Sequence, residues 1–336
     1  MTEWKEYKLG EIGTVITGRT PSARNPEDWG DNMLFITPSD YRNYRKYATN
    51  SERKLSKVGI KRLEKKILPA NSILVTCIGS DMGKVVMNWE SCITNQQINA
   101  IVPNTSVNNN FLYYRLISIY DTLRILGGDG TAVPIVNKSD FENIKIEIPP
   151  LPEQIRIASI LSSLDDKIDL LHLENKTLEA MAETLFRQWF IEEAKEDWEE
   201  KPLSFYGKIV CGKTPPKKES KYFGGETPFI KIPDMHNKTF VINSEDSLTK
   251  EGVLYQKEKI LPPFSIIVSC IATVGLVVLN AKEAQTNQQI NSIIPYEEEY
   301  RYFLYLHLMN MYDDLNAMAS GGTATLNLNT SNFSKI

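Results

Sequence analysis

The sequence predicts an α+β protein made of two homologous mixed α/β domains that are joined by a long, coiled-coil-forming α-helix. Two observations carry this prediction. The first ~140 residues recur about 190 positions later with the same short motifs in the same order, and the stretch between the copies has apolar residues at heptad spacing. We expect a first domain at residues 1–148, the helix at 149–197 and a second domain at 198–336.

The repeat is visible in motifs that keep their order. The tetrapeptide Gly18–Pro21 (GRTP) corresponds to Gly212–Pro215 (GKTP), and the hexapeptide Thr94–Asn99 (TNQQIN) recurs unchanged as Thr286–Asn291. Solenoid repeats have periods of about 20–50 residues, so a period near 190 residues indicates a duplicated domain. Each copy is long enough to bury a core of its own.

Within each copy, short β-branched runs predict buried strands, and amphipathic runs predict short helices. The predicted strands are Ile73–Ile78, Val85–Met87, Ile266–Ile271 and Val277–Leu279. The predicted helices are Phe111–Leu116 and Phe303–Leu308, and loops are expected at Gly127–Gly130 and Ser320–Gly322. The four cysteines and three histidines show no metal-ligand spacing, so we expect buried thiols and no metal site.

The segment between the copies predicts a helix that begins near Pro149. Prolines suit the start of a helix because the amides they lack would be unpaired there, and no further Gly or Pro occurs until Pro202. Apolar residues then alternate by four and three, which is typical of a coiled-coil seam with Asn175 setting the register, although an ordinary amphipathic helix packed on a core is the alternative. The predicted seam and partner-binding residues are Ile157, Leu161, Leu164, Ile168, Leu171, Asn175, Leu178, Leu185 and Trp189.

The net charge of −4 is unevenly distributed. Residues 1–150 hold 19 basic and 16 acidic side chains, residues 151–201 hold 6 and 13, and residues 202–336 hold 13 and 13. The acidity therefore belongs to the helix, and the flanking domains are free to meet a polyanion. No apolar run approaches the length of a membrane span and the N-terminus lacks the hydrophobic stretch of a signal peptide, so we expect a cytoplasmic protein.

Patterns that suggest catalysis fail on physical grounds. Gly207–Thr214 matches the GxxxxGK[ST] pattern of a phosphate-binding loop, but Pro215 and Pro216 remove amides where a helix should begin. Three ExK triplets lack the upstream acidic partner of a nuclease core, and no Asn/Asp-Pro-Pro-aromatic tetrapeptide of an amine methyltransferase is present. We expect no catalytic residue in this chain.

The motifs together resemble the specificity subunits of Type I restriction–modification systems. The resemblance rests on GRTP followed by Trp29–Gly30, on TNQQIN, on the loop at Gly130–Thr131 and on the sequence PPLPEQ at Pro149–Gln154, and it covers nearly the whole chain. It implies that the two copies are target-recognition domains, each reading one half of a bipartite DNA site, and that the helix sets their spacing. It also implies docking of methyltransferase (modification) subunits and of a restriction subunit.

The resemblance implies that S-adenosylmethionine, ATP and Mg belong to those partner subunits and that this chain binds no cofactor. In the family a second helix usually follows the second recognition domain, and none follows here, so a truncated product and a shortened form that makes a homodimer through the central helix are both open. The alternative function is the recognition part of a stand-alone DNA methyltransferase or endonuclease, and a coiled-coil adaptor without nucleic acid is a third.

Two different half-sites require different readers, so we expect sequence preference in the segments where the copies diverge. Ten basic residues between Arg42 and Lys66, interleaved with tyrosines, make a phosphate-contacting surface, with a solvated charged helix as the alternative. Because TNQQIN is identical in both copies, a structural role is favoured over reading of adenine. The predicted DNA-binding residues are Thr20, Ser22, Arg24, Tyr41, Arg42, Asn43, Tyr44, Arg45, Lys46 and Thr131 in the first copy, and Thr214, Lys217, Lys218, Lys221, Lys231, His236, Asn237, Lys238 and Thr323 in the second.

Overall fold

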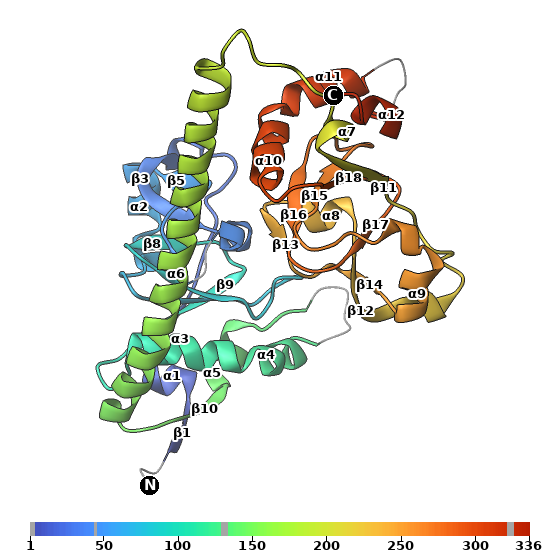
Figure 1. Cartoon of the computed structure of the whole chain (residues 1–336). Helices are drawn as coiled ribbons and strands as arrows, with labels where there is room; N and C mark the ends of the chain where they lie inside the picture. Colours follow the sequence, from blue (N-terminus) through green and yellow to red (C-terminus); the bar gives the residue numbers. More distant parts are fainter. Residues whose placement is uncertain (1–3, 44–45, 129–133, 321–325) are drawn as a thin grey trace. The chain divides into compact units, whose positions relative to one another are not determined.

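The computed structural model describes residues 4–43, 46–128, 134–320 and 326–336 (Figure 1). The chain divides into two compact units, Met1–Glu174 and Asn175–Ile336, here called unit 1 and unit 2. The division falls inside the long helix, which the sequence predicts as a separate segment at residues 149–197. Each unit therefore consists of one copy of the repeat together with a part of the helix.

Unit 1 contains two mixed sheets and a two-stranded ribbon. The larger sheet has the order β2-β9-β6-β7-β4, in which β4 and β7 pair parallel and the other neighbours pair antiparallel. The smaller sheet has the order β5-β3-β8, and β1 pairs with β10 in the ribbon. The strands are β1 (Lys5–Lys8), β2 (Gly13–Thr17), β3 (Trp29–Ile36), β4 (Tyr47–Ala48), β5 (Arg53–Leu55), β6 (Ile73–Thr76), β7 (Val85–Asn88), β8 (Cys92–Thr94), β9 (Ile98–Pro103) and β10 (Lys145–Ile148).

The period of two along β6 explains why the larger sheet is covered on both faces. Ile73 and Val75 pack into a cluster with the helix α3, whereas Leu74 packs into a second cluster on the other face with β3 and β8. The side chain of Asn108 caps α3 by accepting a hydrogen bond from the amide of Phe111 at 3.0 Å. The helices and 3-10 turns are α1 (Leu9–Ile12), η1 (Pro26–Asp28), η2 (Pro38–Asn43), α2 (Lys57–Arg62), η3 (Glu64–Lys66), α3 (Asn109–Ser118), α4 (Tyr120–Leu126) and α5 (Lys138–Asn143).

Unit 2 repeats this topology, with the orders β11-β18-β15-β16-β13 and β14-β12-β17. The predicted duplication and the four predicted strands are thereby confirmed. The strands are β11 (Gly207–Cys211), β12 (Phe223–Ile230), β13 (Phe240–Val241), β14 (Asp246–Leu248), β15 (Ile266–Ser269), β16 (Val277–Asn280), β17 (Gln285–Thr286) and β18 (Ile290–Pro295). The helices and 3-10 turns are α7 (Leu203–Tyr206), η5 (Ser220–Tyr222), α8 (Ile232–Met235), α9 (Lys250–Tyr255), η6 (Lys257–Lys259), α10 (Tyr300–Asn310), α11 (Tyr312–Ala319) and α12 (Thr330–Phe333).

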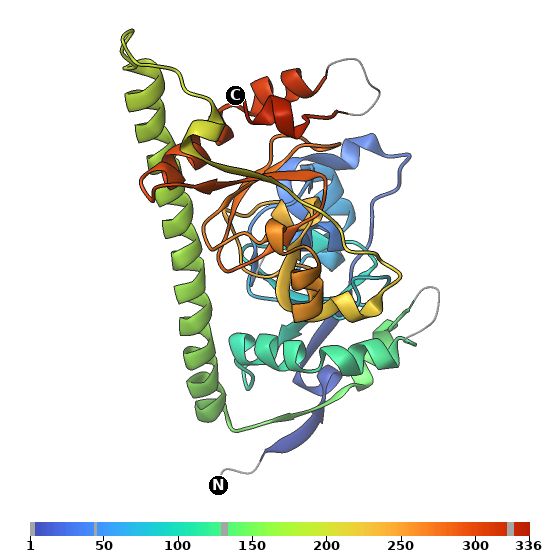
Figure 2. The ribbon, with the colours of Figure 1, turned by 45° about the vertical axis from the view of Figure 1, so that its right-hand side comes forward.

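The long helix α6 runs without a break over 37 residues, Leu151–Arg187, and ends in a π-helical turn, Gln188–Glu192 (Figure 2). At 1.5 Å per residue it is about 55 Å long. Ile157 and Leu161 at its start are partly buried, whereas most of the later seam residues are exposed. The helix is confirmed, and its pairing as a coiled coil stays a prediction. None of the helices that the structure describes is both long and apolar enough to cross a membrane.

Candidate nucleic-acid interface

A buried glutamine fixes the start of α6 to unit 1. The side chain of Gln154 is 1% exposed; its Oε1 accepts from the backbone amide of Asn108 at 2.9 Å, and its Nε2 donates to the carbonyl of Pro149 at 2.8 Å. One turn later Ala158 lies in the core of the unit. The glutamine satisfies backbone groups that burial would otherwise leave unpaired, which gives the PPLPEQ motif a structural reason.

Lys46 is buried against the same helix instead of facing DNA. Its side chain is 4% exposed, and its Nζ donates to Ser162 Oγ at 2.8 Å and to the hydroxyl of Tyr114 at 3.3 Å. The Tyr114 hydroxyl in turn donates to Asp165 Oδ2 at 2.6 Å. Burial lowers the pKa of Lys46, and the nearby carboxylates of α6, led by Asp165, oppose that shift. Lys46 therefore anchors the helix, and its burial argues against the predicted DNA contact.

Tyr41 is a second predicted DNA contact that the structure buries. Its side chain is 5% exposed and packs in the cluster between the two sheets of unit 1, and burial raises its pKa. A side chain in that position cannot reach a phosphate or a base. The predicted contacts Tyr44, Arg45, Thr131 and Thr323 lie outside the described residues, as do the side chains of Arg42 and Asn43.

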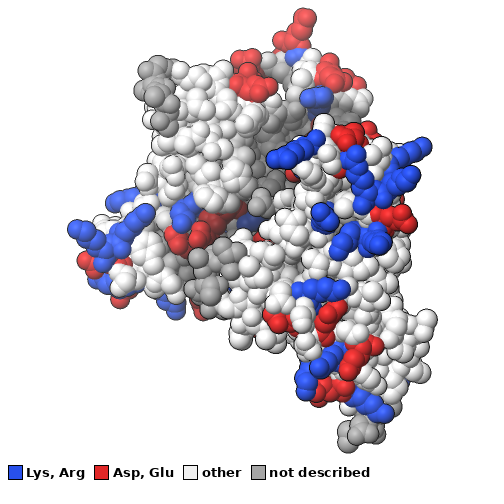
Figure 3. All heavy atoms as spheres, turned by 180° about the vertical axis from the view of Figure 1, so that it is seen from behind, with Lys and Arg blue, Asp and Glu red and all other residues white. Residues whose placement is uncertain are grey.

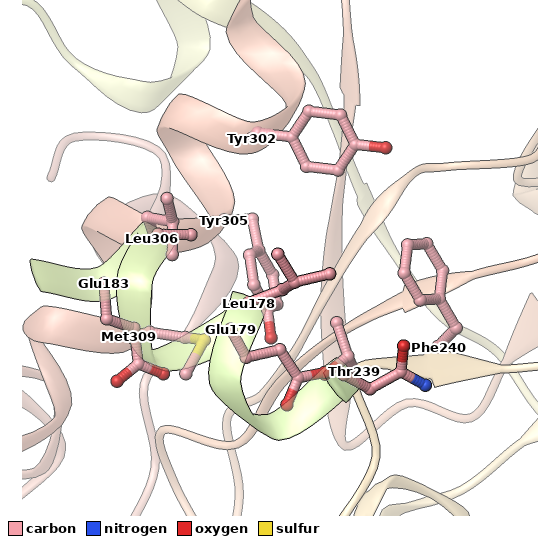
Figure 4. Close-up of a pocket in the computed structure, with 11 residues that line it drawn as sticks. Leu178, Glu179, Glu183, Thr239, Phe240, Tyr302, Tyr305, Leu306 and Met309 are labelled. Carbon is pink, nitrogen blue, oxygen red and sulfur yellow. The ribbon is translucent and has the colours of Figure 1, made fainter. Parts of the chain in front are cut away.

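In unit 2 the equivalent position also meets the helix. Thr239 precedes β13 as Lys46 precedes β4, and its Oγ1 donates to Glu179 Oε1 at 2.6 Å (Figure 4). Phe186 of α6 packs against Phe303 of α10, with ring centroids 5.7 Å apart. Between α6, β13 and α10 lies a mainly apolar hollow of about 360 Å³. It is lined by Asn175, Leu178, Glu179, Ala182, Glu183, Thr239, Phe240, Tyr302, Tyr305, Leu306 and Met309.

The two motifs of each copy meet as a pair of adjacent loops, here called the paired loops: residues 18–21 with 94–97 in unit 1, and residues 212–215 with 286–289 in unit 2. Thr20 Oγ1 donates to Gln96 Oε1 at 2.7 Å, and Thr214 Oγ1 donates to Gln288 Oε1 at 2.6 Å. The close approach requires glycine, because a Cβ on Gly18 would lie 2.2 Å from backbone oxygens of the second loop.

Within TNQQIN, the structural interpretation holds for three of the amides. Asn95 is buried and donates to Gln97 Oε1 at 2.8 Å, and Asn99 is buried and donates to the carbonyl of Val136 at 3.2 Å. The side chain of Gln96, however, is exposed. Gln96 is not among the DNA contacts predicted from the sequence, since an identical hexapeptide gives no signal of which amide faces solvent.

The comparisons with known proteins point to one family. The family described as "Type I restriction modification DNA specificity domain" matches residues 1–180 and 195–336. The chain belongs to this family. It is 33% identical over 422 aligned residues to the Type I restriction enzyme HindI specificity subunit of Haemophilus influenzae, covering 100% of this chain and 89% of that relative.

Two further similarities agree. The chain is 29% identical over 285 residues to the MjaIX specificity subunit of Methanocaldococcus jannaschii, covering 79% of this chain and 65% of that relative. A crystal structure of a Type I restriction-modification S subunit from M. genitalium superposes with a TM-score of 0.61 at 16% identity, covering 100% of this chain and 84% of that one. The structural similarity shows a shared fold. Because the family model matches both copies, we call the two repeated domains specificity domains from here on.

The first specificity domain exposes five of the ten basic residues of the predicted run. Figure 3 shows Lys and Arg side chains gathered over the part of unit 1 that carries β5 and α2, with acidic side chains among them. Arg62 is committed to ion pairs with Glu27 at 2.9 Å and Asp28 at 2.8 Å, and Arg53 lies 3.2 Å from the centre of the Trp29 ring. The remaining exposed cations of this surface are Lys57, Lys61 and Lys65.

The other predicted contacts of both domains divide by exposure. Thr20 and Thr214 are half-buried in the paired loops, and Lys231 forms an ion pair with Asp246 at 2.7 Å, which raises its pKa. Lys221 Nζ is 4.0 Å from Glu251 Oε2 and remains exposed. The other exposed members are Ser22, Arg24, Lys217, Lys218, His236, Asn237 and Lys238.

The nucleotide pattern lies on a strand. Gly207–Cys211 forms β11, and no helix begins at Lys213, so this segment has a different geometry from a phosphate-binding loop. Across the described parts of the chain, no group of three or more His, Cys, Asp or Glu side chains is placed to hold a metal ion. What both specificity domains offer is an exposed polar and basic surface carried on loops and short elements such as β5, α2 and η5, which suits recognition of a polyanion.

Proposed function

We propose that this chain is the DNA-recognising specificity subunit of a Type I restriction–modification complex, in which each specificity domain reads one half of a bipartite site. The single observation that carries this proposal is the family match to both copies of a duplicated domain with the same sheet topology. In this assignment methyl transfer and cleavage belong to partner subunits, and the support for it is that the relatives are named as specificity subunits of Type I restriction enzymes.

The division of labour follows from the chemistry of DNA recognition. Donors on loops read base edges, and phosphate contacts fix position. The segments that differ between the copies are the proposed base readers, because the two half-sites differ. They comprise Ser22, Arg24, Arg42, Asn43, Tyr44 and Arg45 in the first domain and Lys217, Lys218, Lys221, His236, Asn237 and Lys238 in the second. The predicted Thr20, Thr131, Thr214, Lys231 and Thr323 remain proposed DNA contacts beside them.

The helix α6 supplies the proposed partner surface. Leu164 is 57% exposed and Leu178 is 56% exposed, although both lie on the predicted seam. Methyltransferase subunits covering this seam would bring S-adenosylmethionine chemistry to the DNA, and a restriction subunit with ATP and Mg would join that core. The proposal includes one other occupant of the seam, which is the α6 helix of a second copy of this chain.

The experiment is a comparison of genome-wide adenine methylation in cells that differ only in this gene. We expect one bipartite motif, with two half-sites separated by a fixed gap, to lose methylation when the gene is deleted and to regain it on complementation. An unchanged methylation map together with an active partner methyltransferase would contradict the proposal. Methylation or cleavage of DNA by the purified chain alone would instead favour the recognition part of a stand-alone enzyme.

A further inference from the structure

The paired loops present the same three chemical groups in both specificity domains. A basic side chain, Arg19 or Lys213, is followed by a threonine, and that threonine contacts a glutamine of the second loop. Resting on the proposed function, we infer that these three groups form a duplicated site for the DNA sugar–phosphate backbone, which positions each domain on its half-site without reading sequence. Its members are Arg19, Thr20 and Gln96 in the first domain and Lys213, Thr214 and Gln288 in the second.

The geometry of the site is fixed by backbone hydrogen bonds. In the first domain the amide of Arg19 donates to the carbonyl of Thr94 at 2.8 Å, and in the second the amide of Lys213 donates to Thr286 at 2.9 Å. A Cβ on Gly212 would lie 2.0 Å from a backbone oxygen of the second loop, as one on Gly18 would in the first domain. The two loops are thus held together independently of the exposed side chains.

The hydrogen bond from the threonine uses the oxygen end of each glutamine amide. Because the hydroxyl of Thr20 donates to Gln96 Oε1, the oxygen end of the amide is occupied. The Nε2 group of Gln96 has no hydrogen-bond partner within the described parts of the chain, and the side chain is exposed. Gln288 repeats this arrangement with Thr214. An amide with two free N–H groups, on a pair of loops that also carries an exposed cation, is suited to a phosphate oxygen.

The cations at this site are also available. Arg19 and Lys213 are exposed, and neither forms an ion pair with any acidic side chain that the structure describes. The Nζ of Lys213 lies 5.4 Å from the centre of the Tyr255 ring, a cation–π contact, and the residue remains exposed to solvent. This contrasts with Arg62, whose charge is spent on two carboxylates.

The duplication decides between the backbone and the bases. A reader of base edges must differ between the domains wherever the half-sites differ, whereas this site keeps its threonine, its glutamine and its positive charge in both. The sugar–phosphate backbone is the part of the DNA that is the same at every half-site, and contacts to it carry no sequence information. The identical chemistry therefore fits phosphate better than adenine, although glutamine can pair with adenine.

The test uses the full chain assembled with its methyltransferase partner and a mixed-sequence DNA duplex as the probe. Gln96→Glu retains an oxygen that accepts from Thr20, so it preserves the loop pair while placing a negative charge toward the phosphate. We expect Gln96→Ala to weaken binding about three- to tenfold and Gln96→Glu to weaken it further at low salt. Gln288→Ala and Gln288→Glu should behave in the same way.

The cations give an independent measurement. Arg19→Ala or Lys213→Ala should reduce the slope of log affinity against log salt by about 0.9, the value for one phosphate contact, whereas Gln96→Ala should leave that slope unchanged. The matched control is Lys5→Ala, which removes an exposed positive charge from β1 outside the paired loops. In cells, every variant should keep the motif of the wild type at both half-sites.

Three outcomes would overturn the inference. A purely structural glutamine would make Gln96→Glu bind as the wild type does, because the hydrogen bond from Thr20 survives. If the glutamine read a base, its substitution would relax the recognised sequence at one position of one half-site. If the wild-type complex binds and methylates DNA and every variant binds DNA equally well, the paired loops are not a site for the DNA backbone. The proposed function would not be affected by that result. A wild-type complex that does not bind DNA would contradict the proposed function instead.

Discussion

The lysine that precedes β4 shows how a charged side chain can serve the core. The ammonium of Lys46 is almost fully buried, yet it donates to two hydroxyl oxygens and faces the acidic stretch of α6. A buried charge is costly unless hydrogen bonds and opposite charges compensate it, and removal of one partner leaves the others unsatisfied. The contact therefore specifies which part of α6 lies on the first specificity domain.

Lys46→Met should destabilise unit 1 without affecting DNA contacts. The substitution keeps most of the aliphatic volume but leaves Ser162 Oγ without its donor, so we expect the free energy of unfolding to fall by about 1–3 kcal/mol. Urea unfolding of the full chain measures this, with Lys57→Met on the exposed surface of α2 as the matched control. A shallower salt dependence of DNA binding for Lys46→Met would show that the side chain does reach phosphate.

The wild type and Lys46→Met should also differ in how the free energy of unfolding depends on pH. Because burial lowers the pKa of Lys46, the folded chain binds fewer protons at this residue than the unfolded chain between the lowered value and the ordinary 10.5. The free energy of unfolding of the wild type should therefore rise with pH through that window relative to Lys46→Met. A difference that shrinks as the pH rises would mean that the charged form is the one stabilised by folding.

Gly18→Ala tests the close approach of the paired loops. A new Cβ would lie 2.2 Å from the carbonyl oxygens of Thr94 and Asn95, and backbone atoms cannot move away as a flexible side chain can. We expect a loss of about 1–3 kcal/mol in unfolding free energy and weaker DNA binding. The matched control is Gly10→Ala, whose Cβ would meet Glu142 Cβ at 3.3 Å, and equal stability of the two variants would contradict the packing argument.

For single residues, the sequence showed which side chains have chemistry suited to DNA binding, but it did not predict which of them are exposed. It placed Tyr41 and Lys46 in a basic, aromatic run that suits DNA, but the burial of both depends on sheets and a helix that are distant in sequence. It also grouped Gln96 with structural amides, because the hexapeptide is the same in both copies while only the fold decides which side chain faces outward. Such assignments require long-range contacts that periodicity does not contain.

Helices and strands were predicted correctly where the apolar pattern of the sequence is strong. The runs at β6, β7, β15 and β16 are wholly buried, which explains their continuous apolar sequences, and the 37-residue α6 follows its heptad pattern. The two-residue strands β4 and β13 gave no signal, since their pairing is imposed by the neighbouring strands β7 and β16. These short strands nevertheless position Lys46 and Thr239 against α6.

An insertion in α6 tests the helix as a spacer. Four residues added after Lys176 would lengthen it by about 6 Å and add a rotation of roughly 40° beyond one full turn. With a rise of about 3.4 Å per base pair, we expect the gap between the half-sites to change by one or two base pairs while both half-sites keep their sequence. Methylome mapping measures the gap.

The control for this experiment is the same insertion after Lys195, which lies beyond α6 and its π-helical turn. A flexible connection should tolerate it with no change in the recognised gap. If the variant with the longer helix recognised altered half-sites across an unchanged gap, α6 would not set the spacing.

For the molecule as a whole, duplication accounts for the two-part architecture that the sequence predicted. Both copies keep the sheet order and the paired loops, whereas the contact with α6 differs in chemistry, a lysine with Ser162 in unit 1 and a threonine with Glu179 in unit 2. In the proposed function, the common parts would give both domains the same mode of binding, and the segments that differ between the copies would read two different half-sites. The heptad pattern could not supply the occupant of the α6 seam, because it marks an exposed apolar stripe without specifying what covers that stripe.

The seam leads to a prediction about association. Leu164, Ile168, Leu171, Leu178, Leu185 and Trp189 are 39–57% exposed. Full burial of such a side chain contributes about 1.5–3 kcal/mol, so covering these half-exposed groups contributes on the order of 1 kcal/mol each. That sum is large enough to hold two helices together, and Asn175 would favour one register over others. In the absence of a methyltransferase subunit, we expect a second copy of α6 to cover the seam.

The purified chain should therefore sediment as a dimer with antiparallel α6 helices at micromolar concentration, and addition of the methyltransferase subunit should replace the second copy. Leu171→Glu on the seam should yield a monomer, because a desolvated carboxylate opposes the contact. Leu170→Glu is the matched control: Leu170 is 55% exposed, lies off the seam and should leave the dimer intact. A wild-type monomer, or equal dissociation by both variants, would mean that this seam does not mediate self-association.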